Sequence, residues 1–266
     1  RPMLLTRRTA ALGLGLGLVA CGRREQSAAD APPRGSLAWG IAGDWRIECT
    51  IGEGGFGVTY EARNRRTQAH AALKEYMPAG CCSRDPRSSH VAAARGREGD
   101  IFKWGRDRFI KEAETLARLD HPSIVKVMST FEANGTAYMA LDFETGGTLR
   151  TWLDKLGRRP TEAEVDALAS PLLDALREVH SLFLLHRDIK PENILLRPDG
   201  TPVLIDFGAV RSAVANHTTT LGGVNPAATS AFAIVSDGYS PPEQYDPSGR
   251  LMGPASDIYS LGVIAY

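Results

Sequence analysis

The stretch "LLHRDIKPENILLRPDGTPVLIDFGAV", residues 184–210, sets a dense group of charged side chains inside an otherwise apolar run. Within it, NILLR and TPVLID flank the turn sequence PDG, a pattern that predicts a β-hairpin. If the turn centres on Asp199 and Gly200, Asn193 faces Asp206 across the ladder, about 5 Å away. Each residue alone could be a turn or capping residue, but the pair predicts a site for a hard cation such as Mg²⁺.

Asp188 and Lys190 precede this pair in the same stretch. A carboxylate at 188 can accept a proton from a hydroxyl group, and the ammonium of Lys190 can stabilise negative charge on a transferred group. An isolated aspartate would more simply form a surface ion pair. Because Asp188 lies only five residues before Asn193, we interpret the cluster as a group-transfer site beside the cation.

A glycine-rich segment, GEGGFG, follows a strand that alternates from Trp45 to Ile51. Its Gly52, Gly54 and Gly57 would let backbone N–H groups approach phosphate oxygens. The pattern alone is weak evidence, since glycine-rich hairpins are common. A second strand follows it where a dinucleotide-binding fold would have a helix, and the Lys-Ser/Thr ending of a P-loop is absent.

The third predicted strand, HAALKEY, carries a lysine that can reach a cleft. Period two puts Ala72 and Lys74 on one face, where the small Ala72 leaves room for a flat ring. A helix is predicted over Arg106–Leu119, with Glu112 on its apolar stripe. A charge on the buried side needs a partner, and Lys74 is the predicted one. The alternative is that Glu112 is solvated or paired with Arg108.

The rest of the chain is sheet-rich in its first half and helix-rich in its second. Strands are predicted near 127–132 and 137–143, helices over 149–156 and from about Thr161, and an irregular insertion over 76–105. The order predicts an α+β chain of two lobes, residues 45–143 and 144–266, with a cleft between them.

Composition restricts the partners and the redox compartment that we expect for this protein. The 31 basic and 31 acidic residues cancel, so no overall field favours a nucleic acid or an anionic membrane as partner. The four cysteines, Cys21, Cys49, Cys81 and Cys82, fit neither a metal-ligand spacing nor a disulfide framework. We interpret them as free thiols in a reducing compartment.

Residues 1–21 have the layout of a secretory signal with a lipoprotein-type site, LVAC, ending at Cys21. Such a segment would make membrane attachment possible. The alternative is an upstream extension on a cytoplasmic protein. Residues 22–44, rich in small residues and proline, are predicted to be a linker in either case.

Seven motifs in order, GEGGFGVTY, AALK, Glu112 before HPSIV, HRDIKPEN, DFG, PPE and DIYSLG, give residues 45–266 a clear resemblance. The chain resembles the bacterial eukaryotic-like serine/threonine protein kinases. The resemblance implies a bilobal fold with an antiparallel-sheet N-lobe and a mainly helical C-lobe. It also implies ATP and Mg²⁺ as cofactors, Ser or Thr hydroxyls of proteins as acceptors, and a signalling role in the bacterial cytoplasm.

Roles for single residues follow from the same resemblance. It implies catalytic roles for Lys74, Glu112, Asp188 and Lys190, magnesium binding by Asn193 and Asp206, and nucleotide contacts from Gly52, Gly54, Gly57, Thr59, Ala72, Lys74, Asp142 and Glu144. Leu141 is the expected gatekeeper beside the nucleotide. Asp257 is expected to hold the HRD backbone, and Ser236 to lie near Asp188.

The resemblance also suggests how activity could be regulated and which other functions are candidates. Phosphorylation in the loop of residues 209–240, at Thr218, Thr219, Thr220, Thr229 or Ser230, could pair with Arg187 and raise activity; the alternative is solvated loop hydroxyls. The last helix ends at Tyr266 and Glu243 lacks an arginine partner, so a poorly soluble, weakly active fragment is expected. Other candidate functions are a pseudokinase-like binding or scaffold module and an exported lipoprotein sensor.

Overall fold

The computed structural model describes residues 40–85, 87–207, 211–212, 236–246 and 252–266. The predicted signal segment and residues 22–39 of the predicted linker lie outside this part of the chain. The linker prediction is wrong at its end, because Ile41–Ala42 form strand β1, which pairs with Trp45 and Arg46.

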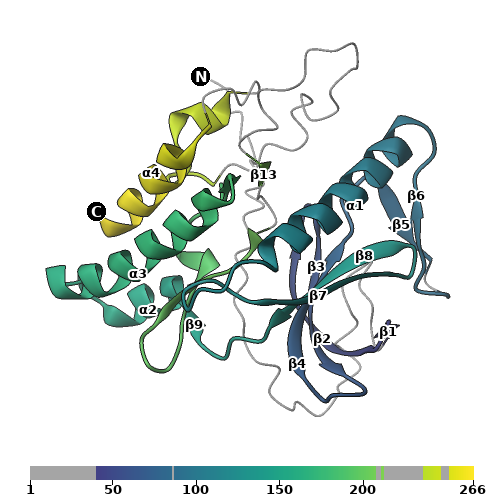
Figure 1. The fold of residues 1–266 in the computed structure, drawn as a ribbon, viewed down its shortest axis with the longest axis horizontal. Coiled ribbons are helices and arrows are strands. Elements are labelled where there is room, and N and C mark those ends of the chain that lie inside the picture. Colours follow the sequence, from purple (N-terminus) through teal and green to yellow (C-terminus); the bar gives the residue numbers. More distant parts are fainter. Residues whose placement is uncertain (1–39, 86, 208–210, 213–235, 247–251) are drawn as a thin grey trace, which may run out of the picture.

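An antiparallel six-stranded sheet forms the first lobe, in the order β1-β2-β3-β4-β8-β7 (Figure 1). Its longer strands are β2 (Trp45–Gly54), β3 (Gly57–Asn64), β4 (His70–Tyr76), β7 (Val127–Ala133) and β8 (Thr136–Asp142). Asn134 and Gly135 join β7 to β8 with φ of 50° and 77°. These are the residue types that a two-residue hairpin turn with positive φ favours.

Strand β2 does not keep the single apolar face that its alternation predicts. Its pairing with β3 shifts between Ile47 and Cys49 and again between Thr50 and Gly52. A bulge adds a residue on one strand and turns the following side chains. Trp45 and Ile47 therefore pack in the core of the sheet's outer face, whereas Ile51 packs against the core that extends into the second lobe.

The insertion after β4 is ordered, contrary to the prediction of an irregular segment over 76–105. It contains the hairpin of β5 (Cys82–Arg84) and β6 (Val91–Ala93). Helix α1 then begins at Arg97, well before the predicted Arg106, and runs to Leu116. Its early turns are stabilised by tertiary packing, because Phe102 is buried with its ring 5.5 Å from that of Tyr76.

Helices dominate the second lobe (Figure 1). They are α2 (Leu149–Leu156), α3 (Glu162–Ser181) and α4 (Pro254–Ala265), with short 3-10 turns at Pro191–Asn193 and Pro242–Tyr245. The predicted start of α3 is confirmed: Thr161 caps it and forms a reciprocal capping box with Glu164. No helix in the described ranges is long and apolar enough to cross a bilayer.

Two small sheets carry the charged stretch of residues 184–210. One has the order β12-β11-β9, with Pro202–Leu204, Ile194–Leu196 and Gly147–Thr148, and the other pairs β10 (Leu184–Leu185) with β13 (Arg211–Ser212). The hairpin forms, but Ile194 pairs with Leu204, so Asn193 lies opposite Ile205. The predicted register is therefore wrong by one residue.

The reason for the shift is the turn. Gly200 N–H donates to the carbonyl of Arg197 at 2.8 Å, so the turn spans residues 197–200 and centres on Pro198 and Asp199. Asp206 then lies one position beyond the pairing with Asn193, and its φ of 60° turns the chain there.

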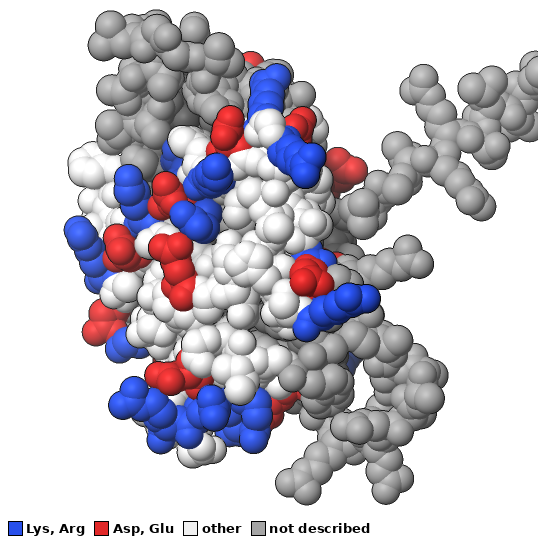
Figure 2. All heavy atoms as spheres, turned by 90° about the vertical axis from the view of Figure 1, so that its right-hand side faces the viewer, with Lys and Arg blue, Asp and Glu red and all other residues white. Residues whose placement is uncertain are grey.

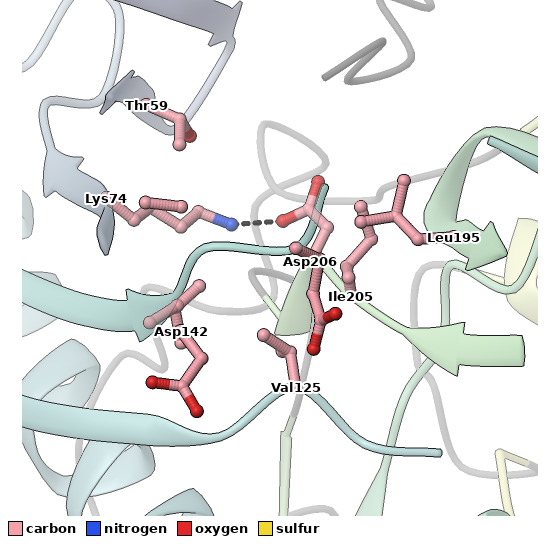
Figure 3. Close-up of a pocket in the computed structure, with 10 residues that line it drawn as sticks. Thr59, Lys74, Val125, Asp142, Leu195, Ile205 and Asp206 are labelled. Carbon is pink, nitrogen blue, oxygen red and sulfur yellow. Dashed lines mark hydrogen bonds and ion pairs between the residues drawn. The ribbon is translucent and has the colours of Figure 1, made fainter. Parts of the chain in front are cut away.

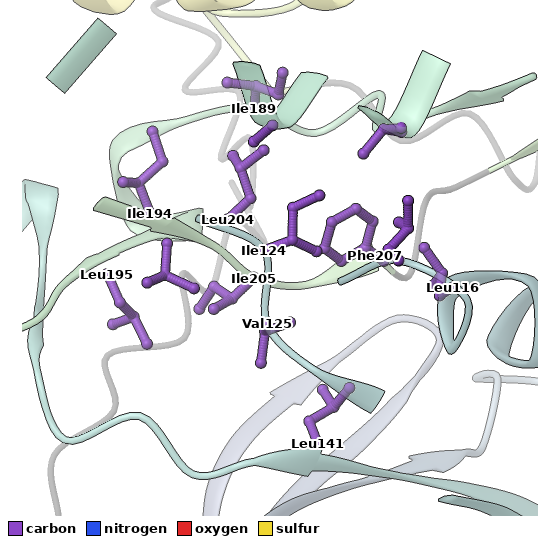
Figure 4. Packing of buried hydrophobic residues seen from close by; sticks show 14 of the residues in the cluster. Leu116, Ile124, Val125, Leu141, Ile189, Ile194, Leu195, Leu204, Ile205 and Phe207 are labelled. Carbon is purple, nitrogen blue, oxygen red and sulfur yellow. The ribbon is translucent and has the colours of Figure 1, made fainter. Parts of the chain in front are cut away.

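A continuous apolar core joins the lobes (Figure 4). Val125 N–H donates to the carbonyl of Leu204 at 3.0 Å, and Leu204 N–H donates to the carbonyl of Ser123 at 2.9 Å. Ile124, in the segment between α1 and β7, thus forms an isolated parallel β-bridge with Leu204 of β12. It fixes the floor of the region where the two lobes meet.

Candidate active site

Asp188 is the centre of a buried cluster of polar side chains. Lys190 Nζ lies 3.1 and 2.8 Å from its two carboxylate oxygens, and Asn193 Nδ2 donates to Oδ2 at 2.8 Å. Ser236 Oγ donates to Oδ1 at 2.6 Å. The structure therefore brings together the three residues that lie close in sequence and adds Ser236, which the family resemblance placed near Asp188.

Asp257 on α4 holds the backbone that presents Asp188. Its carboxylate accepts hydrogen bonds from His186 N–H at 2.9 Å and from Arg187 N–H at 2.8 Å. Arg187 has a φ of 68°, a left-handed conformation that is costly for a residue with a side chain. His180 Nε2 lies 2.8 Å from the same carboxylate. The expected contact of Asp257 with the HRD backbone is thus present in the structure.

Lys74 and Glu112 do not form the predicted ion pair. Lys74 Nζ contacts Asp206 Oδ1 across the cleft (Figure 3). Glu112 Oε1 instead accepts from Arg108 Nε at 2.8 Å, one turn away on α1. Because a pair spaced i, i+4 forms within one helix, it requires no approach of α1 to β4. The alternative partner considered from the sequence, Arg108, is the one observed.

The Asp206 carboxylate is held in its charged form. Burial raises its pKa, but the charge and hydrogen bond of Lys74 outweigh burial, and His186 and Lys190 add to the lowering. The net pKa lies below the usual value for aspartate. Lys190 therefore acts electrostatically on Asp206 as well as on Asp188, and the two carboxylates share one basic environment.

A cleft opens between β3, β4 and the end of β8 on one side and β11 and the residues just after β12 on the other. Its lining combines apolar side chains with several polar ones, and the Lys74–Asp206 contact lies between its two sides (Figure 3). The residues that line it are Thr59, Ala72, Lys74, Val125, Leu141, Asp142, Glu144, Leu195, Ile205 and Asp206. A cleft that is largely apolar with a few charged groups suits a flat ring joined to an anionic chain.

The three glycines of GEGGFG have different surroundings. Gly52 pairs with Thr59 and Gly54 with Gly57 in the β2–β3 ladder. A Cβ on Gly54 would meet nothing within 4 Å, whereas a Cβ on Gly57 would overlap the carbonyl oxygen of Glu75. Gly57 is therefore required for close packing on β4, while Gly54 leaves open backbone at the tip.

The segment after β8 is tied to the second lobe by a charged clamp. Arg197 Nε and one terminal nitrogen donate to Glu144 at 2.9 and 2.5 Å, and its other terminal nitrogen donates to the carbonyl of Pro122 at 2.8 Å. The hydrogen bond with Glu144 is the main reason that the pKa of Arg197 is raised. The Glu144 side chain is thus engaged, which leaves its backbone for the predicted adenine contact.

Comparison with known proteins supports the interpretation of this cleft and the Asp188 cluster as an active site. Residues 45–266 match the protein kinase domain family. The chain belongs to the protein kinase family. It is 36% identical over 224 residues to the serine/threonine-protein kinase PknA of Nostoc sp., covering 83% of this chain and 36% of that protein.

Two further relatives agree. The chain is 36% identical over 220 residues to the serine/threonine-protein kinase PknL of Mycobacterium bovis, covering 83% of this chain and 47% of that protein. The solved structure "PpkA-294 apo form" superposes with a TM-score of 0.65 at 34% identity, covering 88% of this chain and 76% of that one. The kinase chain spans about a third to a half of the length of the curated relatives it matches.

The kinase family implies ATP and Mg²⁺, and the residues present fit the metal. Asn193 uses its amide nitrogen for Asp188, which leaves its amide oxygen as the possible ligand. Asp206 is an ionised carboxylate. Within the described ranges no group of three or more His, Cys, Asp or Glu could hold a metal. Two oxygen ligands completed by phosphate are typical of magnesium in kinases.

Some kinase residues escaped the sequence reasoning. Val125, Leu195 and Ile205 line the cleft although their runs predict only buried strands. The Arg197 clamp joins residues 53 positions apart, and no local pattern signals it. The expected gatekeeper Leu141 does line the cleft. The proposed phosphorylation sites, Thr218, Thr219, Thr220, Thr229 and Ser230, lie outside the described residues.

Proposed function

We propose that this chain transfers the γ-phosphoryl group of ATP, with Mg²⁺, to Ser or Thr hydroxyls of protein substrates in bacterial signalling. The observation that carries the proposal is a serine hydroxyl already seated at the site. Ser236 Oγ lies 2.6 Å from Asp188 Oδ1 and 3.2 Å from Lys190 Nζ. An aliphatic hydroxyl thus fits between a carboxylate that can accept its proton and a cation.

The chemistry that these residues support is in-line transfer to an oxygen nucleophile. Asp188 orients the acceptor hydroxyl and takes its proton as the oxygen bonds to the γ-phosphorus and the bond to the bridging oxygen of ADP breaks. Lys190 stabilises the charge on the group in transit. Asn193 and Asp206 would hold Mg²⁺, which would neutralise charge on the phosphates. Positioning and electrostatics supply most of the catalysis in this reaction class.

The residues that line the cleft would bind the nucleotide. Thr59, Ala72 and Leu195 would enclose the ring, the backbone of Asp142 and Glu144 would bind its edge, and the open tip at Gly54 would cover the phosphates. Lys74 lies in the same cleft and would contact the phosphates. In the structure it neutralises Asp206, so nucleotide binding would exchange that contact for phosphate and metal.

The test is Mg²⁺-dependent transfer of labelled γ-phosphate to a generic basic protein, followed by phosphoamino acid analysis. Asp188→Asn and Lys74→Met should each lower transfer by about 10²-fold or more, because each removes a group that acts on the reacting atoms. Asp166→Asn, an exposed residue on α3, is the matched control and should leave transfer unchanged. Label on tyrosine alone, or transfer that survives Asp188→Asn, would refute the proposal.

The competing function is a pseudokinase-like module that binds ATP without transferring phosphate. The curated relatives, which are named as serine/threonine kinases, do not favour it. Nucleotide binding by calorimetry without detectable transfer would support this alternative and exclude the enzyme.

We propose that the kinase works in the bacterial cytoplasm, because that compartment supplies ATP. Attachment to the membrane through residues 1–21 is the associated proposal. Mass spectrometry of the N-terminus in cells tests both, since a lipidated Cys21 on an exported chain would contradict the cytoplasmic location.

A further inference from the structure

The β5–β6 hairpin, for which the sequence suggested no role, contacts the residue next to Lys74 on β4 through Arg84. Strand β4 presents Lys74 to the cleft and its neighbour Glu75 to the opposite face. Glu75 is fully buried, with a side-chain exposure of 0%. A buried carboxylate next in sequence to a cleft lysine needs several partners.

Those partners come from three strands, β3, β5 and β8. Tyr60 donates to Glu75 Oε2 at 2.8 Å, Tyr138 donates to Oε1, and Arg84 from β5 pairs with Oε2. The Arg84 side chain is only 5% exposed, and its second terminal nitrogen donates to the carbonyl of Ser89 at 2.6 Å. Burial lowers the pKa of Arg84, but pairing with Glu75 outweighs it and keeps the guanidinium charged.

Arg84 is distinct from the charges on the surface of this face. Figure 2 views the side on which β5 and β6 lie and shows basic and acidic side chains interspersed around an uncharged centre. Exposed ion pairs of that kind contribute little. A buried pair is different, because removing one partner leaves an uncompensated charge, and its net gain over an apolar pair is small. Fixing one geometry is therefore a better explanation of Arg84 than added stability.

The same insertion is bonded to the tip of the glycine-rich loop. Met77 N–H donates to the carbonyl of Phe56 at 3.0 Å, and Ala79 N–H donates to the carbonyl of Gly55 at 3.0 Å. The close approach at Gly57 sets the loop against the carbonyl of Glu75. The insertion thus contacts the glycine-rich loop and also Glu75, the neighbour of Lys74.

We propose that Arg84 is a positioning residue for ATP: its pairing with Glu75 fixes β4, and thereby Lys74 and the glycine-rich loop, from behind the sheet. Glu112 on α1 is bound to Arg108 in this structure, so α1 does not hold Lys74 here. Lys74 Nζ is held by Asp206, and β4 is held by its pairing with β3 and β8 and by the contact of Glu75 with the hairpin. The inference rests on the proposed function, because it concerns how that site binds ATP.

The experiment separates positioning from simple stabilisation by restoring charge balance. Arg84→Met leaves Glu75 charged and buried, so this variant should lose thermal stability. The double variant Glu75→Gln with Arg84→Met has no buried charge and should recover most of the stability. We expect its KM for ATP to stay at least tenfold above wild type, with kcat changed less, because the site loses its geometry rather than its reactive groups.

Two further variants complete the test. Arg84→Lys keeps the charge but cannot bind Glu75 and the Ser89 carbonyl through one planar fork, so its KM for ATP should rise about threefold. Arg87→Met, an exposed arginine on the same hairpin, is the matched control and should behave as wild type. If neither Arg84→Met nor the double variant folds, Arg84→Lys decides the question. A folded Arg84→Lys protein with an unchanged KM for ATP overturns the inference.

The outcomes also distinguish this inference from the proposed function. Wild-type phosphate transfer is measured first, and its absence would count against the function alone. Calorimetric binding of MgATP to each variant then tests positioning without turnover. A double variant that binds MgATP with wild-type affinity would show that Arg84 only stabilises the fold and would overturn the inference.

Discussion

The Asp188 cluster and the cleft around Lys74 differ in the sequence separation of the residues that contact one another. In the second lobe, Asp188, Lys190 and Asn193 lie within six residues and contact one another directly. In the cleft, Lys74 reaches Asp206 across 132 positions. The local half is built by one loop and its support. The other half depends on how two lobes face each other.

This difference has a functional meaning. The Asp188 cluster is held by hydrogen bonds on all sides and by a backbone that Asp257 fixes, so it is pre-organised for a hydroxyl. In the cleft, Lys74 is paired with Asp206, and Glu112 is paired with Arg108. Nucleotide binding must rearrange both ion pairs. We therefore expect substitutions in the local half to lower kcat, and substitutions in the long-range half to act first on ATP binding.

The largest effect should come from breaking the support of the local half. Asp257→Ala leaves the N–H groups of His186 and Arg187 buried without an acceptor, which should cost about 3 kcal/mol of the free energy of unfolding. We also expect kcat to fall about 100-fold, because a 1 Å misplacement of a catalytic group has that order of effect. Denaturant unfolding and steady-state kinetics measure both. A folded Asp257→Ala protein with normal kcat would show that the loop holds itself.

A second prediction addresses the long-range half. The family resemblance implies that Lys74 pairs with Glu112 when nucleotide is bound, whereas Arg108 holds Glu112 in this structure. We expect Glu112→Gln to raise the KM for ATP about tenfold, the order of one charged pair at a partly exposed site. Arg108→Met should not raise it, because Arg108 competes with Lys74 for the same carboxylate.

Kinetics of the two variants at matched MgATP concentrations provide the measurement. Arg118→Met, an exposed arginine just after α1, is the control for loss of a basic side chain nearby. An unchanged KM for ATP in Glu112→Gln would contradict the prediction, because it would show that Lys74 does not need Glu112 to bind nucleotide.

The sequence was informative where structure is local and less so where it is tertiary. Alternation and turn chemistry predicted β4 at His70–Tyr76 and α2 at Leu149–Leu156 with the observed bounds. The spacing of Asp188, Lys190 and Asn193 predicted their cluster. The fold as a whole was predicted from the family motifs rather than from periodicity.

The failures have physical causes. The hairpin register was wrong because PDG allows more than one turn centre, and the choice depends on the Arg197–Gly200 hydrogen bond. The β5–β6 hairpin was missed because its strands are only three residues long, too short for an alternating pattern to reveal them. The partner of Lys74 could not be predicted, because two carboxylates, Glu112 and Asp206, compete for it and geometry decides.

The smallest expected effect tests the most local contact of all, the capping box of α3. Glu164 Oε2 accepts from Thr161 N–H at 2.8 Å, and Arg158 pairs with both carboxylate oxygens at 2.8 Å. The hydrogen bond from Arg158, with those from Thr161, lowers the pKa of Glu164 to about 2. Because the folded pKa is below the unfolded one, the contact stabilises the protein above the usual glutamate pKa, near 4.5. Its stabilisation is lost as the pH falls through about 2.

Glu164→Gln should therefore destabilise the protein slightly at pH 7 and progressively less between pH 4.5 and 2, where the carboxylate is protonated in the unfolded chain but still ionised in the folded protein. Urea unfolding of both proteins at pH 7 and pH 3 measures the difference, and Glu162→Gln, an exposed neighbour in the same first turn, corrects for the helix dipole. A difference that is the same at both pH values would mean that the capping hydrogen bonds, and not the charge on Glu164, fix the start of α3. Since this contact lies far from Asp188 and Lys74, kcat and the KM for ATP should be unchanged in both variants.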